Sequence, residues 1–156
     1  MGIQHLKYLL MSTITLSYIS CAKHRFSDDE LLALLEHCHA HNSQHNISGL
    51  LLYNGASTFL QVLEGEQDIV EQLYLRISTD KRHHRVNCIL KKAIEKRDFP
   101  DWKMGFRNLS KTPLLNIEGF SNFMQASDAT SYLSENASFA NTMLKHFKNT
   151  SQEILL

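Results

Sequence analysis

The sequence predicts a fold of the α+β class, because strand-like and helix-like patterns alternate along its first two thirds. The clearest pattern is a predicted β-hairpin in residues 49–65, GLLLYNGASTFLQVLEG. On either side of it, residues 27–42 and 66–78 carry apolar side chains at the spacing of an amphipathic helix. We therefore expect one sheet that contains the hairpin and a layer of helices packed against it.

The hairpin consists of two apolar runs, residues 50–53 and 58–63, joined through Asn54-Gly55. Asn and Gly both tolerate positive φ, so this pair is a strong turn signal. Strand side chains alternate between the two faces of a sheet, and both runs are apolar on both faces. Both strands are therefore expected to lie inside a sheet that is covered on two sides.

Three more strands complete the order β-α-β-β-α-β-β over residues 13–108. This order is that of a ferredoxin-like sandwich, with a five-stranded mixed sheet and two helices on one face. A capping box formed by Ser27 and Glu30 begins the first helix. The three strands are residues 14–19, 86–94 and 102–106, and Trp102, Met104 and Phe106 are expected on one face of the last.

The chain divides into three regions. Residues 1–12 are expected to be an N-terminal extension, and residues 13–108 form the α+β domain. Residues 109–156 are rich in Ser and Asn, and they contain an amphipathic helix at about 136–148 and a shorter helix around Tyr132. A helix this short is marginal alone, so this C-terminal helical extension should pack on the sheet or at a subunit interface.

Composition argues against several classes of protein. The chain has 156 residues, enough for one domain with a real core, and its formal net charge of zero argues against a general nucleic-acid binder. The three cysteines are scattered without a CxxC pair, which suits a reducing compartment. No apolar run approaches the roughly 20 residues of a membrane span, so we expect a cytoplasmic protein.

Three polar residues are predicted on otherwise apolar surfaces. Gln61 lies in the second strand of the hairpin, Tyr18 on the apolar face of the first strand, and Asn42 on the apolar stripe of the first helix. A buried amide without a partner costs about 1–3 kcal/mol. Gln61 could be satisfied by the backbone, Tyr18 could be a core tyrosine, and Asn42 could be a helix cap. If both helices cover one sheet face, the three instead surround a gap suited to a flat polar heterocycle.

Titratable and charged residues give two further candidates. Four histidines fall between His37 and His45, where they could hold zinc or could simply be solvated near a helix C-terminus. No cysteine lies at finger spacing from them, and no further metal ligand is evident. Arg82, in the charged run 80–85, is either part of a solvated loop or a contact to an anion or a cofactor edge.

Five segments of the sequence are distinctive in combination: ITLSYIS, FSDDELLALL, AHNSQHNISGLLLYNGASTFLQVLEGE, DKRHHRV and FPDWKMGF. Through them, residues from about 13 to 108 resemble the BLUF domain, the blue-light sensor that uses flavin. The hairpin, the His-Asn pair at the end of the helix and the W-x-M-G-F motif are specific in combination. The C-terminal region also resembles the two helices of short, single-domain members.

The resemblance implies that the protein binds FAD, and it implies roles for the residues around the flavin. Tyr18 matches the tyrosine that donates an electron and a proton to the photoexcited flavin. Gln61 matches the glutamine that bridges this tyrosine and the flavin, and Asn42 the asparagine that bonds the isoalloxazine edge near C4=O and N3. His41 and Arg82 match positions that line the flavin.

Two more residues are implicated in signalling by the resemblance. Trp102 and Met104 match a pair on the fifth strand that responds to light, and which of them faces the flavin is left open. Gln61 suits a switch because its amide has a donor end and an acceptor end on one planar group. Cys38 departs from the family pattern, since many members have serine there, and a hydrogen bond in the pocket is expected to change.

The function implied is that of a blue-light photoreceptor without enzymatic activity of its own. It would signal to a separate partner protein, and it would form a homo-oligomer. The alternative is a ferredoxin-like enzyme or metal-binding module that uses the histidines between His37 and His45. An RNA-binding module shares the element order, but the sequence lacks the exposed aromatic motif and the basic bias of that class.

Overall fold

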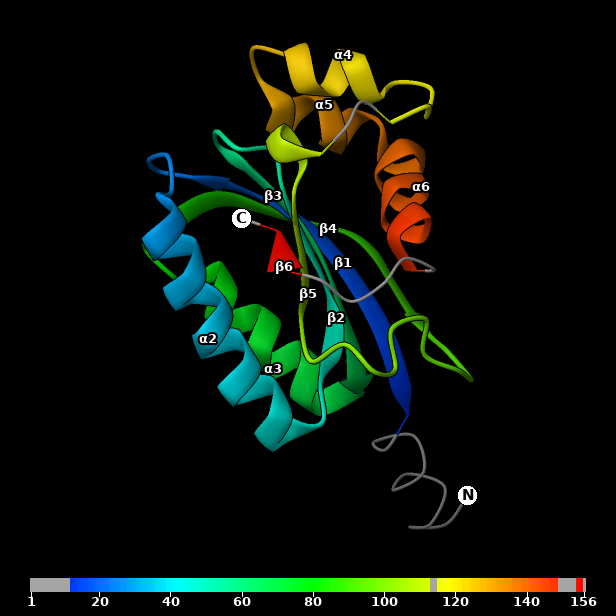
Figure 1. Ribbon diagram of the computed structural model, residues 1–156. Coiled ribbons are helices and arrows are strands. Elements are labelled where there is room, and N and C mark those ends of the chain that lie inside the picture. Colours follow the sequence, from blue (N-terminus) through cyan, green and yellow to red (C-terminus); the bar gives the residue numbers. More distant parts are fainter. Residues whose placement is uncertain (1–11, 113–114, 149–153, 156) are drawn as a thin grey trace, which may run out of the picture.

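The structure is a computed structural model, and it describes residues 12–112, 115–148 and 154–155. Of the expected N-terminal extension, residues 1–11 lie outside the described part of the chain. Two layers of helices enclose a central sheet (Figure 1). Within the described residues, no helix combines the length and apolar character that crossing a membrane requires. The helices are α2 (Asp28–His45), α3 (Gln67–Ser78), α4 (Phe120–Gln125), α5 (Ala129–Glu135) and α6 (Ala137–Lys148).

The sheet confirms the predicted α+β class and the predicted mixed five-stranded order. Its strands run in the order β4-β1-β3-β2-β5-β6, and β5 lies parallel to β2 while the pairs among β1 to β4 are antiparallel. The short β6 pairs with β5 at the edge and was not predicted, because two residues carry no periodicity. The strands are β1 (Thr13–Ala22), β2 (Ser48–Tyr53), β3 (Thr58–Glu66), β4 (His83–Ala93), β5 (Gly105–Asn108) and β6 (Ile154–Leu155).

Helix α2 begins as the sequence predicts and ends later. The Ser27 hydroxyl accepts a hydrogen bond from the Glu30 amide, and the Glu30 carboxylate accepts one from the Ser27 amide. The helix continues to His45, three residues beyond the predicted end, and Asn46 ends it in a left-handed conformation with φ 53°. Asn tolerates this conformation, so Asn46 is the cap and Asn42 lies inside the helix.

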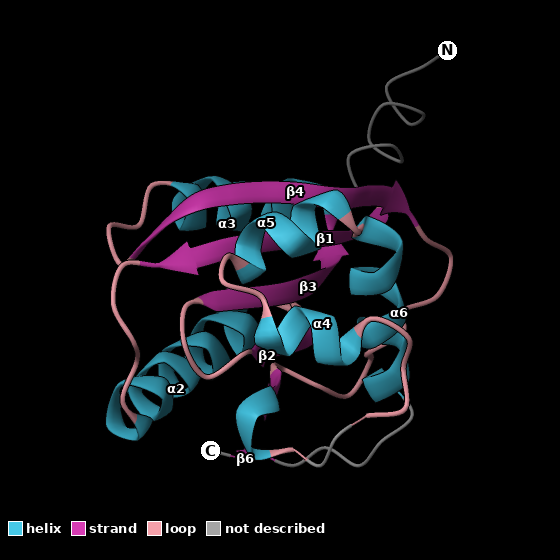
Figure 2. Ribbon diagram, turned by 90° about the horizontal axis from the view of Figure 1, so that it is seen from above, coloured by secondary structure: helices cyan, strands magenta, loops and turns pink. Residues whose placement is uncertain are grey.

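The two faces of the sheet form separate hydrophobic clusters. All residues of β2, and all but the last of β3, are buried, as expected for strands that are apolar on both faces. Phe59 and Leu63 point toward α2 and α3, whereas Leu60 and Val62 point toward the C-terminal helices. The sheet thus separates the molecule into two compartments, with α2 and α3 on one side and α4 to α6 on the other (Figure 2).

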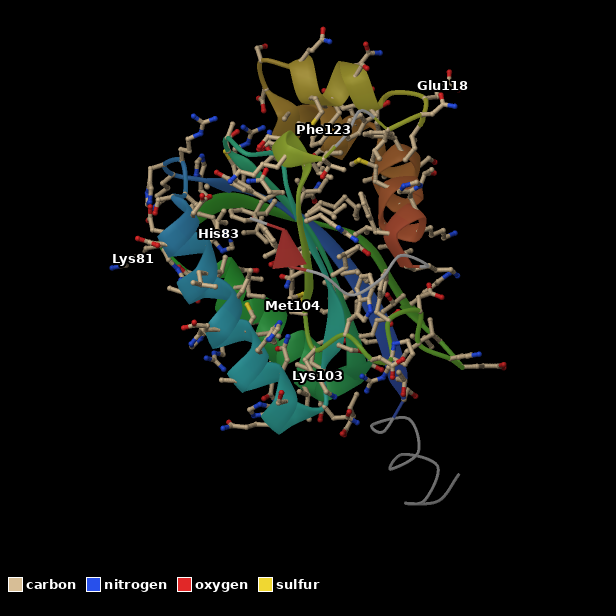
Figure 3. The ribbon with its side chains drawn as sticks, viewed as in Figure 1. Lys81, His83, Lys103, Met104, Glu118 and Phe123 are labelled. Atoms are coloured by element: carbon tan, nitrogen blue, oxygen red, sulfur yellow. The ribbon has the colours of Figure 1, made fainter. Side chains whose placement is uncertain are left out.

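Helices α5 and α6 pack directly on the sheet, and α4 packs on α5. Phe123 and Phe147 are 2% and 3% exposed within the cluster that these helices share with β1, β2 and β3. Figure 3 shows Phe123 beneath α4, facing the rest of the helical layer. A buried hydrogen bond of 2.8 Å joins the hydroxyls of Thr58 on β3 and Thr130 on α5. The sheet face therefore stabilises helices that would be marginal alone.

The prediction of the fifth strand was wrong in two respects: where the strand begins and which way Trp102 points. The strand β5 begins only at Gly105, and a bend at Lys103 and Met104 precedes it. Because of that bend, Trp102 packs in the cluster on the side of α4 to α6, whereas Met104 and Phe106 pack on the side of α2 and α3. The indole of Trp102 lies against Gly105, where a Cβ would come within 2.3 Å of the ring.

The C-terminal layer provides a direct test of this packing. Phe123→Ala should lower the free energy of unfolding by about 3–5 kcal/mol, because it leaves a cavity in the cluster under α4. Leu75→Ala on α3 is the control, since Leu75 is 64% exposed, and its effect should stay within about 0.5 kcal/mol. Urea unfolding of the three proteins measures both effects. Equal stability of the two variants would contradict the packing described here.

Candidate functional site

The centre of the site is a pair of polar side chains on adjacent strands. In the antiparallel register of β1 and β3, Tyr18 lies directly opposite Gln61. Directly opposed residues project from the same face of a sheet, within reach of each other. Both side chains therefore point toward α2 and α3, and they are both 4% exposed. The register of the two strands brings them together.

The amide of Gln61 is bonded at both ends. Its Oε1 accepts a hydrogen bond from the hydroxyl of Tyr18, and its Nε2 donates to the sulfur of Met104 at 3.1 Å. Thioether sulfur is a weak acceptor and has no proton to donate. The donor and acceptor ends of this amide are therefore distinguished by their partners.

Tyr18 is held as a neutral phenol. Burial raises its pKa well above the ordinary value, and the nearby Cys38, Tyr74 and Asp80 raise it further. The ring of Tyr74 on α3 packs edge-on against it, with 5.7 Å between ring centres. The phenolic proton consequently stays on Oη, where it is shared with Oε1 of Gln61.

Asn42 ties α2 to the segment that precedes β5. The side chain is 2% exposed, and its Nδ2 donates to the carbonyl of Lys103 at 2.6 Å. One turn earlier, Nε2 of His39 lies 2.8 Å from the carbonyl of Met104. These contacts hold the bend beside α2, where Figure 3 shows Lys103 and Met104. The amide oxygen of Asn42 lies 3.4 Å from Nδ1 of His41.

A cavity of about 170 Å³ lies between α2 and α3 and ends at the sheet. Tyr18 and Gln61 form part of its floor, and Asn42 lines it from α2. Its other walls are largely apolar. The structure also brings the remaining residues expected around a ligand, His41 and Arg82, to this cavity. The apolar lining residues are Phe26, Leu34, Leu51, Phe59, Leu63, Leu73 and Ile77.

Two arginines lie where the cavity meets the surface, and each has a partner. Nη1 of Arg76 on α3 lies 3.2 Å from Nε2 of His41 on α2. Burial lowers the pKa of His41, so its imidazole is neutral and can accept this bond. Arg82 forms a two-point ion pair with Asp80, with 2.6 Å between Nη2 and Oδ2, and its hydrogen bonds lower the pKa of Asp80 to about 2.

Two further residues line the cavity. Ser20 was not identified as a ligand contact from the sequence, and Cys38 departs from the family pattern. Ser20 is fully buried, lines the cavity and has no hydrogen-bond partner for its hydroxyl among the described residues. It lies two residues after Tyr18 on the same strand face, and this spacing could have identified it. Cys38 also lines the cavity, and burial raises the pKa of its thiol to about 11, so it is uncharged.

A family model described as "Sensors of blue-light using FAD", BLUF, matches residues 13–105, which is more than half of the chain. The chain belongs to the BLUF family. The family is one of light sensors, in agreement with the prediction that this domain is not itself an enzyme. The resemblance seen in the sequence motifs is thereby confirmed.

BLUF relatives include domains of much longer proteins. The photoactivated adenylate cyclase subunit alpha of Euglena gracilis is 42% identical over 84 residues, which are 54% of this chain and 8% of that protein. Subunit beta from the same organism is 39% identical over 92 residues, or 58% of this chain and 10% of that protein. The chain thus matches a tenth or less of the length of these curated relatives.

Solved structures show the same fold in proteins of different length. The photo-activated state of BlsA has a TM-score of 0.67 at 25% identity, and the match covers 92% of this chain and 99% of that one. A bacterial light-regulated adenylyl cyclase also has a TM-score of 0.67, at 28% identity, and the match covers 88% of this chain and 39% of that one.

The cavity fits the FAD that BLUF domains use. An aromatic ring system needs apolar walls, and the cavity provides them on both helices and on the sheet. A polar ring edge needs donors and acceptors, and the buried, unpartnered hydroxyl of Ser20 requires a partner inside the cavity. We expect Asn42, His41 and Arg82 to hold the flavin from the helices and their connecting loop.

The structure separates Trp102 from the other expected site residues. Met104 contacts Gln61, whereas Trp102 lies on the opposite side of the sheet and packs on Phe99 with 5.5 Å between ring centres. The resemblance to the family implied that both residues belong to the site, and the strand pattern placed them on one face of an unbroken strand. The bend at Lys103 and Met104 is a tertiary feature, stabilised by Asn42, and no turn residue announces it.

The histidines of α2 take separate partners. His39 contacts the carbonyl of Met104, His41 contacts Arg76, and Nδ1 of His45 lies 2.8 Å from the carbonyl of His41. His41 and His45 also stack, with 4.2 Å between ring centres. In the part of the chain that the structure describes, no three His, Cys, Asp or Glu side chains are grouped to hold a metal ion.

Asn42 should contribute to flavin binding in addition to its bond to Lys103. Asn42→Ala should weaken the binding of FAD by about 1–3 kcal/mol, because it leaves buried polar groups without a partner. The helix should persist, since Ala is the best helix former. Titration of the flavin-free protein with FAD measures the change in affinity.

The matched control is Ser43→Ala, which alters the exposed neighbour of Asn42 on the same helix. It should leave the affinity for FAD unchanged. If Asn42→Ala binds FAD as tightly as this control, Asn42 serves only to tie α2 to Lys103.

Proposed function

We propose that this protein senses blue light by rearranging the hydrogen bonds of the Gln61 amide. The observation that supports this is the position of that amide between the hydroxyl of Tyr18 and the sulfur of Met104. The three side chains come from β3, β1 and the segment before β5. One buried group therefore joins the flavin cavity to the segment that precedes β5.

The flavin, when bound, absorbs blue light and supplies the redox chemistry. The protein orients it and excludes water from it. Tyr18 holds its proton at Oη, and the described contact of that proton is Oε1 of Gln61. Movement of the Tyr18 proton therefore bears first on the Gln61 amide.

A change in the Gln61 amide must also affect Met104. If the amide turns end over end, or if its proton positions change so that the Met104 side becomes an acceptor, two acceptors face each other. The sulfur of Met104 has no proton to offer, so this contact is lost. Rearrangement of one or two buried hydrogen bonds is worth about 1–3 kcal/mol, which is the size of a typical allosteric coupling.

The light signal would be transmitted from the cavity through β5 to helices α4 to α6 on the opposite face of the sheet. Met104 is followed immediately by Gly105, the first residue of β5, and Trp102 joins the same segment to the cluster under α6. We infer that a separate partner protein reads this surface and that the chain works as a homo-oligomer. The match to BlsA, whose structures are described in a ground state and a photo-activated state, supports a domain of this fold that responds to light.

Two substitutions test the hydrogen-bond switch. Tyr18→Phe keeps the ring but removes the transferable proton, and Gln61→Leu keeps the approximate volume but removes the amide. Both variants should still bind FAD, because the contacts from α2 remain. We expect the wild-type protein to show a reversible red shift of flavin absorption after blue light, and both variants to lose it. Light-minus-dark absorption spectra measure this shift.

Matched controls are available on other surfaces of the molecule. Gln72→Leu alters an exposed glutamine of α3, and Tyr132→Phe removes a hydroxyl bonded to Gly119 at 3.3 Å on the opposite side of the sheet. Both controls should keep the normal red shift. A normal shift in Gln61→Leu would mean that the signal is stored elsewhere and would overturn the proposal.

A further inference from the structure

Glu64 is a buried carboxylate that the light-sensing cavity does not use. It lies on β3 three residues after Gln61, so its side chain points to the opposite face of the sheet. It is 1% exposed, and its strand neighbours in register are Thr15 on β1 and Ser48 on β2. Buried carboxylates are rare unless they are bonded, which raises the question of what this one holds.

Its partners are backbone groups of the loop between β4 and β5. Oε1 of Glu64 accepts a hydrogen bond from the Phe99 amide at 2.9 Å. The Asp98 amide and the Thr15 hydroxyl also donate to the carboxylate. All three partners can donate, and a carboxylate accepts at both oxygens. Burial raises the pKa of Glu64, and these three hydrogen bonds act in the opposite direction. One side chain of a central strand thus fixes two consecutive amides in the middle of this loop.

The same loop ends at Met104, five residues after Phe99. The ring of Phe99 packs on Trp102, and the indole of Trp102 lies against Gly105. A shift of Phe99 would therefore displace Trp102 and, through Gly105, the residue that contacts Gln61. Charged groups near Glu64 include Asp98, whose carboxylate lies 3.3 Å from Nζ of Lys148 at the end of α6.

We propose that Glu64 is the positioning residue that keeps Met104 against Gln61, and that it thereby sets how long the light-induced state lasts. This inference rests on the proposed function, since it concerns the same hydrogen-bond switch. Glu64 acts from the far side of the sheet, through the loop. Arg97 assists from the loop itself, with Nη1 2.9 Å from the hydroxyl of Ser48.

Glu64→Gln is the decisive variant. The Gln side chain keeps the volume and one acceptor oxygen. Its NH₂ group, however, replaces the second oxygen of the carboxylate, so two N–H donors then face each other and one hydrogen bond is lost. Trp102 is the only tryptophan of the sequence and is 8% exposed, so its fluorescence reports the loop directly. In Glu64→Gln the Trp102 emission should shift to longer wavelength, and quenching by acrylamide should increase. This readout does not depend on the photocycle, so it separates failure of the loop model from failure of the proposed switch.

The second readout is the rate of recovery in the dark. Glu64→Gln should change that rate by about threefold to tenfold, the range expected for coupled residues. In a Met104→Leu background, Glu64→Gln should change the recovery rate less than about 1.5-fold, because the contact between the sulfur of Met104 and Gln61 has already been removed. An equal effect in both backgrounds would show that Glu64 does not act through Met104, and it would overturn the proposal.

The control and a milder variant keep the test decisive. Glu118→Gln alters an exposed carboxylate near the start of α4, as Figure 3 shows, and it should leave emission and recovery unchanged. Should Glu64→Gln fail to fold, Thr15→Val removes only one donor to Glu64 and should give smaller shifts of the same sign.

In the wild-type protein, hydrogen exchange at the Phe99 amide should be as slow as at amides of β3. Rapid exchange there would refute the proposal.

Discussion

The register between β1 and β3 is the constraint on which the rest of the site depends. It places Tyr18 opposite Gln61, and the burial of both strands on both faces keeps it there. A slip of one residue would move every side chain of β3 to the other face. Gln61 would then lie among the aromatic rings under α4, and the cavity between α2 and α3 would lose its polar floor. The hydrophobic pattern of two strands therefore specifies the chemistry of the pocket.

The sheet also divides two tasks between its faces. The face under α2 and α3 encloses the ligand cavity, and the face under α4 to α6 stabilises the helices. The segment before β5 connects the two faces in a few residues, because its bend sends Trp102 to one side and Met104 to the other. A compact connection of this kind can couple the two compartments without a large movement of either.

Much of this arrangement could be predicted from the sequence, and the exceptions have physical causes. The hairpin, the capping box and the burial of Gln61 and Asn42 follow from alternation, helical periodicity and local hydrogen bonding. The direction of Trp102 could not be predicted, because the bend is stabilised by Asn42, a residue 60 positions earlier in the chain. Ser20 was not singled out, because its significance lies in a buried hydroxyl without a partner among the described residues.

The protonation of the pocket has a consequence for the conditions under which the protein can operate. Burial raises the pKa of Tyr18 and lowers that of His41, so both shifts favour the neutral form. The Cys38 thiol is likewise uncharged, with a pKa of about 11. None of the three groups changes its charge between neutral and moderately alkaline pH. These three side chains should therefore contribute no change of charge to the flavin cavity across that range.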